Sequence, residues 1–222
     1  SPLFTGDAGS GESEIRRWII ENDLLECIVQ LSDRMFFNTG IVTYIWIINN
    51  RKENKRKNKV QLIDASEYFD NLKQNLGEKK KVITSNQINE VYKIYTLFKE
   101  GEKSKIYQND YFGYKKIDTY KPLIKDGNLL KDKNGEIKPD KASKDTEKIP
   151  INEDIEQFSD KHLKPYVEDI IVDLKSVKIG YEINFNNEFY KFTPLRSLEE
   201  IKEDILKINE EIDQLNLEID KL

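Results

Sequence analysis

The stretch 197–222 carries the pattern that most restricts how this chain can fold. Aliphatic residues recur in it at alternating spacings of three and four, as in a helix that pairs with another helix. Ser197 and Glu200 have the spacing of a capping box, which predicts the start of the helix. The seam residues are Leu198, Ile201, Ile205, Ile208, Ile212, Leu215, Ile219 and Leu222. We expect a long coiled-coil-type helix that binds a partner; the alternative is a helix packed on its own domain.

The first third of the chain predicts an α/β arrangement. Residues 12–23 have the periodicity of an amphipathic helix, and 24–31 is an apolar run suited to a buried strand. The β-branched and aromatic run 43–48 predicts a second strand, and 59–64 a third. The connection between the first two strands is too short for a helical crossover, so these strands should be antiparallel.

The middle of the chain is less regular. Thr84 or Ser85 can cap a helix whose apolar face carries Ile88, Val91, Tyr95 and Phe98. Beyond it we expect an extended or hairpin element at 104–123, a mobile loop at 125–148, a short helix at 155–166 and a hairpin at 181–192 around Asn186 and Asn187.

Composition excludes several classes of protein. The net charge of −5 argues against a protein that simply coats nucleic acid, although a local basic patch could still contact phosphates. The single cysteine, Cys27, excludes an internal disulfide and suits a reducing cytoplasm; its apolar strand makes it a core residue rather than a nucleophile. The longest apolar run, Thr43–Ile48, is too short to cross a bilayer. With His162 as the only histidine, we expect no metal site.

A glycine-rich segment, Gly6 to Gly11, invites comparison with a nucleotide-binding loop. Such a loop needs a strand directly before it and a helix directly after it. Only five residues precede Gly6, so we interpret the segment as a flexible entry to the helix at 12–23. The chain also starts at Ser1 in a Gly/Ser-rich stretch, which is consistent with a piece of a longer protein.

The connection between the first two strands contains adjacent aromatics, Phe36 and Phe37, followed by Asn38, Thr39 and Gly40. An exposed aromatic in such a turn could stack on a base extruded from a duplex. On these residues alone, burial of both rings at the strand ends is the favoured interpretation.

Several segments resemble one family of enzymes. The run SGESEIRRWIIENDLLECIVQLSDRMFFNTGIVTYIWIINNRK is similar to the later part of the methyltransferase domain of type I restriction–modification methylation subunits, which are adenine-N6 DNA methyltransferases. KVQLIDAS, INEVYKIYTLF, SKIYQNDYFGYKKI and KIGYEINFNNEFYKF also look like features of that family. The resemblance extends over nearly the whole chain and implies the C-terminal part of a Rossmann-like, S-adenosylmethionine-dependent methyltransferase sheet.

Two motifs of that family are missing. Its members carry a glycine motif that binds S-adenosylmethionine and an Asn-Pro-Pro-aromatic motif that holds the adenine amino group. Here all six prolines are isolated, and no F-x-G-x-G occurs. The resemblance therefore implies that the full subunit uses S-adenosylmethionine bound mostly outside this chain. It assigns no catalytic residue to this chain, which should not methylate DNA by itself.

What the resemblance carries over is a set of contacts. Phe36 matches the first aromatic of the F-x-N-T-G motif beside the target-base pocket, and Phe37 keeps an aromatic where the family often has tyrosine. Asn38 and Thr39 would shape the turn, with Gly40 supplying backbone freedom. A basic loop could approach DNA phosphates through Arg51, Lys52, Lys55, Arg56 and Lys57, although a merely solvated loop is an equal alternative.

Partners also follow from the resemblance. They are DNA, a specificity subunit bound through the C-terminal helix, a second methylation subunit and a restriction subunit, all in the cytoplasm. We expect 1–66 to end the methyltransferase domain, 67–196 to form a mixed α+β extension, and 197–222 to bind the partner. Two rivals stay open: a non-enzymatic coiled-coil module, and a self-sufficient enzyme that binds a nucleotide at Gly6 to Gly11.

Overall fold

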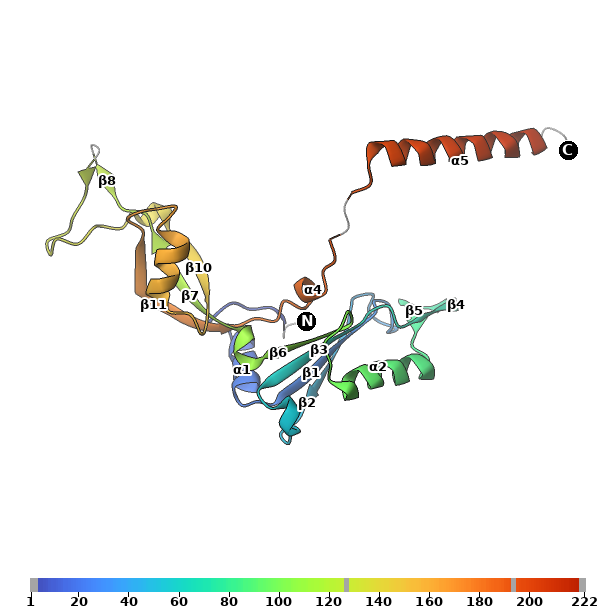
Figure 1. Ribbon diagram of the computed structural model, residues 1–222, viewed down its shortest axis with the longest axis horizontal. Helices are drawn as coiled ribbons and strands as arrows, with labels where there is room; N and C mark the ends of the chain where they lie inside the picture. The colour runs from blue at the N-terminus through green and yellow to red at the C-terminus, as the bar shows by residue number, and fades with distance from the viewer. Residues whose placement is uncertain (1–3, 126–127, 193–194, 220–222) are drawn as a thin grey trace. The chain divides into compact units, whose positions relative to one another are not determined.

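The computed structural model describes residues 4–125, 128–192 and 195–219 (Figure 1). The chain divides into two compact units, Ser1–Phe189 and Tyr190–Leu222. Each unit is described by itself.

The first unit is built around a four-stranded sheet with the strand order β2-β1-β3-β6. Its strands are β1 (Leu25–Leu31), β2 (Tyr44–Ile48), β3 (Lys59–Ala65) and β6 (Ser104–Gln108). β1 pairs antiparallel with β2, as predicted, and parallel with β3, while β3 pairs antiparallel with β6. The first three strands therefore occur where the apolar runs predict them.

Both faces of this sheet are covered, which explains why β1 and β3 are almost continuously apolar. On one face, Cys27 and Val29 pack with residues of helix α2 (Ser85–Leu97). On the other face, Ile28 packs with Ile20 of helix α1 (Gly11–Glu21) and with Phe185. The observed architecture is thus mixed α/β, and α2 and β6, which the sequence assigns to the extension, belong to this sheet and its cover.

Helix α2 begins at a residue that the sequence indicates as its cap, and α1 begins one residue before the predicted segment 12–23. Thr84 caps α2 in a full capping box with Gln87, and the Ser10 side chain accepts a hydrogen bond from the Ser13 amide at the start of α1. The glycine-rich segment is therefore a helix entry, as predicted. It is also tethered, because the buried Arg16 guanidinium donates to the carbonyls of Thr5 and Gly6.

A second sheet has the order β10-β7-β11 and is antiparallel throughout. It consists of β7 (Gly113–Tyr120), β10 (Asp145–Pro150) and β11 (Ile171–Tyr181). A 3₁₀ turn, η3 (Asn109–Phe112), leads from β6 in the first sheet to β7 in the second. The segment 104–123 is therefore extended, as predicted, but it is not a hairpin.

Two further predictions need correction. Part of the segment 125–148 is ordered secondary structure, because 145–150 forms β10 through main-chain pairing with β7 although only Ile149 is buried. The hairpin predicted at 181–192 is wrong: Ile183 and Phe185 turn into the core, and the chain forms the short helix α4 (Phe185–Glu188). The helix predicted at 155–166 is present as α3 (Ile155–Phe158) followed by the π-helical turn η5 (Ser159–Leu163).

The remaining short elements have no counterpart in the sequence-based description. They are η2 (Asn54–Arg56), the paired strands β4 (Asp70–Leu76) and β5 (Lys79–Val82), the paired strands β8 (Ile124–Lys125) and β9 (Asn128–Leu129), and η4 (Lys141–Ser143).

The second unit contains helix α5 (Leu198–Ile219). Its capping box is present, since the Glu200 amide donates to Ser197 Oγ at 3.2 Å and the Ser197 amide donates to Glu200 Oε2 at 3.0 Å. The seam side chains from Leu198 to Leu215 are between 40% and 70% exposed. Leu222 lies outside the described residues.

Candidate nucleic-acid interface

The candidate interface lies where the parallel strands β1 and β3 end together. Leu31 and Ala65, their last residues, are paired in register. The connection 32–43 follows β1 at this edge, and the hairpin β4–β5 follows β3. In open α/β sheets, ligands bind at the carboxyl ends of the strands, so this edge is where a site is expected.

The connection after β1 presents two aromatic rings to solvent. Phe36 is 48% exposed and Phe37 58% exposed, whereas the preceding Met35 is buried and anchors the turn. A bridge between Phe36 and Thr39 closes the turn, and the Ile41 amide donates to Thr39 Oγ1 at 3.3 Å. Burial of both rings, the interpretation favoured by these residues alone, is therefore wrong.

The other two residues of this turn have different surroundings. Asn38 is exposed. Gly40 does not have a positive φ, so backbone freedom is not what it supplies. A Cβ at Gly40 would lie 3.2 Å from Glu78 Oε2 and 3.8 Å from Arg34 Cγ, so a larger residue there would require only a small shift of the exposed Glu78 side chain.

Main-chain hydrogen bonds fix the hairpin to the aromatic turn. The Glu78 amide donates to the Phe37 carbonyl at 3.1 Å, and the Lys80 amide donates to the Arg34 carbonyl at 2.9 Å. Gly77, at φ +61°, passes so close that a Cβ would lie 3.0 Å from the Phe37 oxygen. The ammonium of Lys79 lies 5.0 Å from the centre of the Phe37 ring, within the range of a cation–π contact.

The basic residues of loop 51–57 fall into a buried group and an exposed group. Lys52 is buried, and its ammonium donates to Asp23 Oδ1 at 2.6 Å and to the Lys59 carbonyl at 2.9 Å. Arg56 is 3% exposed, pairs with Glu26 and lies 4.3 Å from the ring centres of both Tyr95 and Phe98. Neither cation is available to a phosphate, so both predictions are corrected. The exposed residues of the set are Arg51, Lys55 and Lys57.

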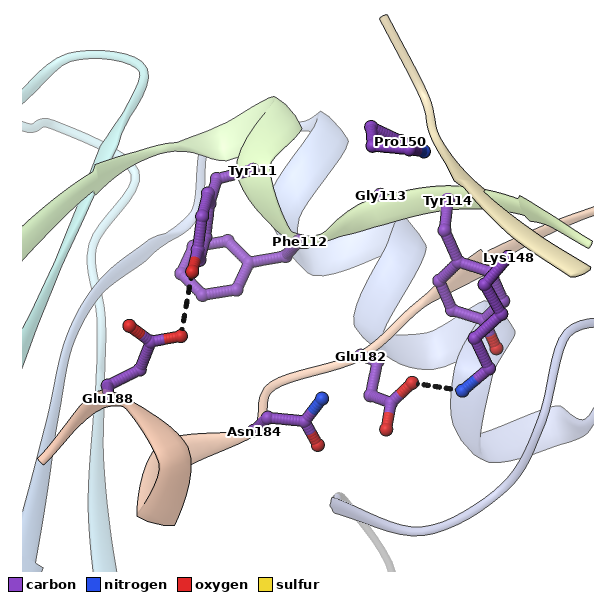
Figure 2. Close-up of a pocket in the computed structure, with 9 residues that line it drawn as sticks. All are labelled: Tyr111, Phe112, Gly113, Tyr114, Lys148, Pro150, Glu182, Asn184 and Glu188. Carbon is purple, nitrogen blue, oxygen red and sulfur yellow. Dashed lines mark hydrogen bonds and ion pairs between the residues drawn. The ribbon is translucent and has the colours of Figure 1, made fainter. Parts of the chain in front are cut away.

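A pocket of about 270 Å³ lies elsewhere, between the second sheet and the segment that leads to α4 (Figure 2). Most of its charged groups are already paired. Tyr111 Oη donates to Glu188 Oε1 at 2.8 Å, Tyr107 also donates to Glu188, and Lys148 pairs with Glu182 at 2.5 Å. These pairs join distant segments, so we interpret the pocket as a structural junction rather than a reactive site.

Tyrosines in this junction and in the core give a pH prediction. Burial, with hydrogen bonds to carboxylates, raises the pKa of Tyr107 and Tyr111 above the usual 10 and raises the pKa of Tyr114 to about 12. The folded state therefore holds these protons more tightly than the unfolded state. Their contribution to stability is complete below pH 10 and is lost as pH rises toward 12.

We expect some of the 11 tyrosines to ionise only at a pH well above 10, together with unfolding, when tyrosinate absorbance and circular dichroism are followed in parallel. The variant Glu188→Gln should lower the pKa of Tyr107 and Tyr111 and leave that of Tyr114 unchanged. Ionisation of all tyrosines near pH 10 in the folded protein would contradict this expectation.

The described part of the chain offers neither a metal site nor a membrane-spanning helix. No group of three or more His, Cys, Asp or Glu side chains there could hold a metal ion. No described helix combines the length and apolar character needed to cross a membrane. Cys27 is buried, as predicted, and burial raises the pKa of its thiol far above the usual value.

Comparison with known proteins identifies the family. Residues 3–120 match the family model described as N-6 DNA Methylase. This match covers more than half of the chain, and the chain belongs to the N-6 DNA methylase family.

Individual relatives are methylase subunits of type I restriction enzymes. The MjaIX methylase subunit of Methanocaldococcus jannaschii is 32% identical over 124 residues, which cover 55% of this chain and 21% of that subunit. The HindI methylase subunit of Haemophilus influenzae is 48% identical over 56 residues, covering 25% of this chain and 12% of that subunit. The resemblance inferred from the sequence is thereby confirmed, and the match spans only about a fifth or less of these relatives' length.

Among solved structures, a type I restriction–modification methyltransferase subunit from Streptococcus thermophilus has 24% sequence identity to this chain. The superposition covers 50% of this chain and 22% of that one, with a TM-score of 0.42.

The hairpin β4–β5 is the part of this interface that the sequence-based prediction missed. Its signal is present in the sequence, because Gly77 and Glu78 form a turn directly before three consecutive lysines.

Proposed function

We propose that this chain is part of the methylation subunit of a type I restriction–modification system, which transfers a methyl group from S-adenosylmethionine to adenine N6 in DNA. The observation that carries the proposal is the pair of exposed rings, Phe36 and Phe37, at the carboxyl edge of parallel strands in a member of the N-6 DNA methylase family. An enzyme acting on a base must first extrude it from the duplex, and an exposed ring can stack on the extruded base.

The glycine-rich segment Gly6 to Gly11 has no open loop for a nucleotide. The carbonyls of the glycine-rich segment accept hydrogen bonds from Arg16, and a Cβ at Gly6 would lie 2.4 Å from Ser10 Oγ, so the loop is closed on itself. We therefore place the S-adenosylmethionine site mostly outside this chain and assign the chain two tasks: completing the base pocket and assembling the subunits. By itself the chain should be inactive.

The exposed face of α5 supports the assembly task. An uncovered row of Ile and Leu side chains is costly in water and favours a helical partner. We propose that this partner is the helical spacer of a specificity subunit, in a cytoplasmic complex that also contains a second methylation subunit and a restriction subunit. We also propose that loop 51–57 contacts DNA phosphates through its exposed cations, Arg51, Lys55 and Lys57.

The substitution Phe36→Ala tests the base-contact proposal. Loss of one base–aromatic stack removes about 1–3 kcal/mol, or roughly 5- to 150-fold in rate. In the complete methylation complex we expect slower methylation and weaker fluorescence from 2-aminopurine placed at the target adenine. The control Tyr166→Ala removes another exposed aromatic, far along the chain, and should change neither signal. Equal fluorescence in Phe36→Ala and the parent would contradict the proposal.

A non-enzymatic coiled-coil module is the second candidate, and the exposed seam of α5 is the observation that favours it. The two candidates differ in one measurement. A pure assembly module would tolerate Phe36→Ala without loss of methylation, whereas the methyltransferase proposal requires a loss.

A further inference from the structure

The sheet separates the basic loop from the aromatic turn. Loop 51–57 precedes β3, and the turn follows β1, which runs parallel to β3, so the two segments lie at opposite edges of the sheet. Each of these strands has seven residues, which at about 3.3 Å per residue gives a separation on the order of 20 Å. That distance corresponds to roughly six steps along a DNA strand. The loop is therefore too far away to hold the phosphates next to a base stacked on Phe36.

Other cations lie at the edge that carries the aromatic turn. They are Arg34, whose side chain is 46% exposed and whose Nε lies 3.7 Å from Asp33 Oδ2, and Lys73, Lys79 and Lys80 of hairpin β4–β5. Among the described residues, no ion pair involves these three lysines. Lys81 differs, because its ammonium pairs with Asp33 and donates to Ser32 Oγ at 2.9 Å. The hairpin thus presents positive charge that the protein itself does not neutralise.

The hairpin is also fixed in place, which favours binding. Its main-chain bonds to Arg34 and Phe37 hold it against the turn, and the Lys79 ammonium lies over the Phe37 ring. Cations held in position before binding lose less conformational freedom than cations on a free loop. Lys79 is therefore placed to reach a phosphate close to a base that contacts the aromatic turn.

We propose that hairpin β4–β5 is a phosphate-binding arm that holds the DNA strand carrying the extruded base. Lys79 and Arg34 contact the phosphates nearest that base, and Lys73 and Lys80 contact phosphates farther along the strand. This inference rests on the proposed role of the aromatic turn, and it moves the principal phosphate contacts from loop 51–57 to the opposite edge of the sheet.

The test measures how DNA affinity depends on salt. Each lost phosphate contact lowers the slope of log affinity against log salt by about 0.9. For the variant Lys73→Gln/Lys79→Gln/Lys80→Gln in the complete complex, we expect the slope to fall by about 2–3 and the affinity to fall roughly 10- to 100-fold. The control Lys131→Gln/Lys133→Gln/Lys138→Gln removes the same charge from exposed positions and should leave the slope unchanged.

A loop variant, Arg51→Gln/Lys55→Gln/Lys57→Gln, also removes three charges. Its salt slope is compared directly with that of the hairpin variant. An unchanged salt slope in the hairpin variant, with unchanged thermal unfolding, overturns the inference. A larger fall of the salt slope in the loop variant than in the hairpin variant also overturns it. The 2-aminopurine fluorescence of Phe36→Ala is measured independently of these two salt slopes. Loss of that signal together with an unchanged hairpin slope would retain the proposed function and reject only the arm.

Discussion

Replacing Arg56 by methionine should lower the free energy of unfolding by about 3–5 kcal/mol, because it leaves the buried Glu26 without its cation. Glu26 Oε1 lies 3.6 Å from Arg56 Nε, and Glu26 also accepts hydrogen bonds from Asn49 and Tyr95. Arg56 in turn donates to Gln61 Oε1 at 3.1 Å and to the Tyr95 carbonyl. Chemical denaturation followed by circular dichroism measures the loss.

The matched control is the neighbour Lys55→Met, which removes one exposed charge and should cost less than about 0.5 kcal/mol. A double-mutant cycle with Glu26→Gln separates the pair from its surroundings, since neutralising Glu26 should recover part of the loss in Arg56→Met. Equal stability of Arg56→Met and Lys55→Met would show that the buried network contributes nothing.

The same residues show why a basic loop could not be interpreted from sequence alone. Lys52 and Arg56 lie among other charged residues, and the pattern there indicates only a solvated surface. Their partners, Asp23 and Glu26 for the charges and Tyr95 and Phe98 for the guanidinium face, come from distant segments. Burial of a cation depends on such tertiary partners, which no local pattern contains.

The elements that were predicted correctly have local causes. β1 and β3 are apolar because both sheet faces are covered, and α2 and α5 begin at capping boxes that can be identified from residue spacing. β10 escaped prediction because an edge strand is held by main-chain pairing and needs few apolar side chains. The hairpin at the candidate interface escaped for the same reason, since most residues of β4 are exposed.

The exposure of Phe36 and Phe37 needed tertiary information as well. Met35, next to them in sequence, is buried, and no local rule separates these three apolar residues. The hairpin β4–β5 contributes to the outcome, because its amides donate hydrogen bonds to the carbonyls of Arg34 and Phe37 and the Glu78 side chain lies beside Gly40. Local sequence therefore locates the turn but does not reveal which rings remain in solvent.

Introducing aspartate at Ile205 and Ile212 should abolish capture of the specificity subunit. The two side chains are 52% and 48% exposed and lie seven residues apart on one face of α5. Burying an isoleucine against a partner contributes about 1.5–3 kcal/mol, and two lost contacts together weaken binding by roughly 100- to 10,000-fold before the cost of burying charge is added. Co-purification and isothermal titration with the specificity subunit measure the effect.

The control places the same change of charge on the opposite face of the helix, as Lys207→Gln/Gln214→Asp. These positions are also seven residues apart, so helix propensity and net charge change similarly while the seam stays apolar. Capture should persist in the control and fail in the seam variant, with the first unit equally stable in both. If both variants are captured equally, α5 does not pair through this seam. If neither is captured, added negative charge rather than loss of the apolar seam explains the effect.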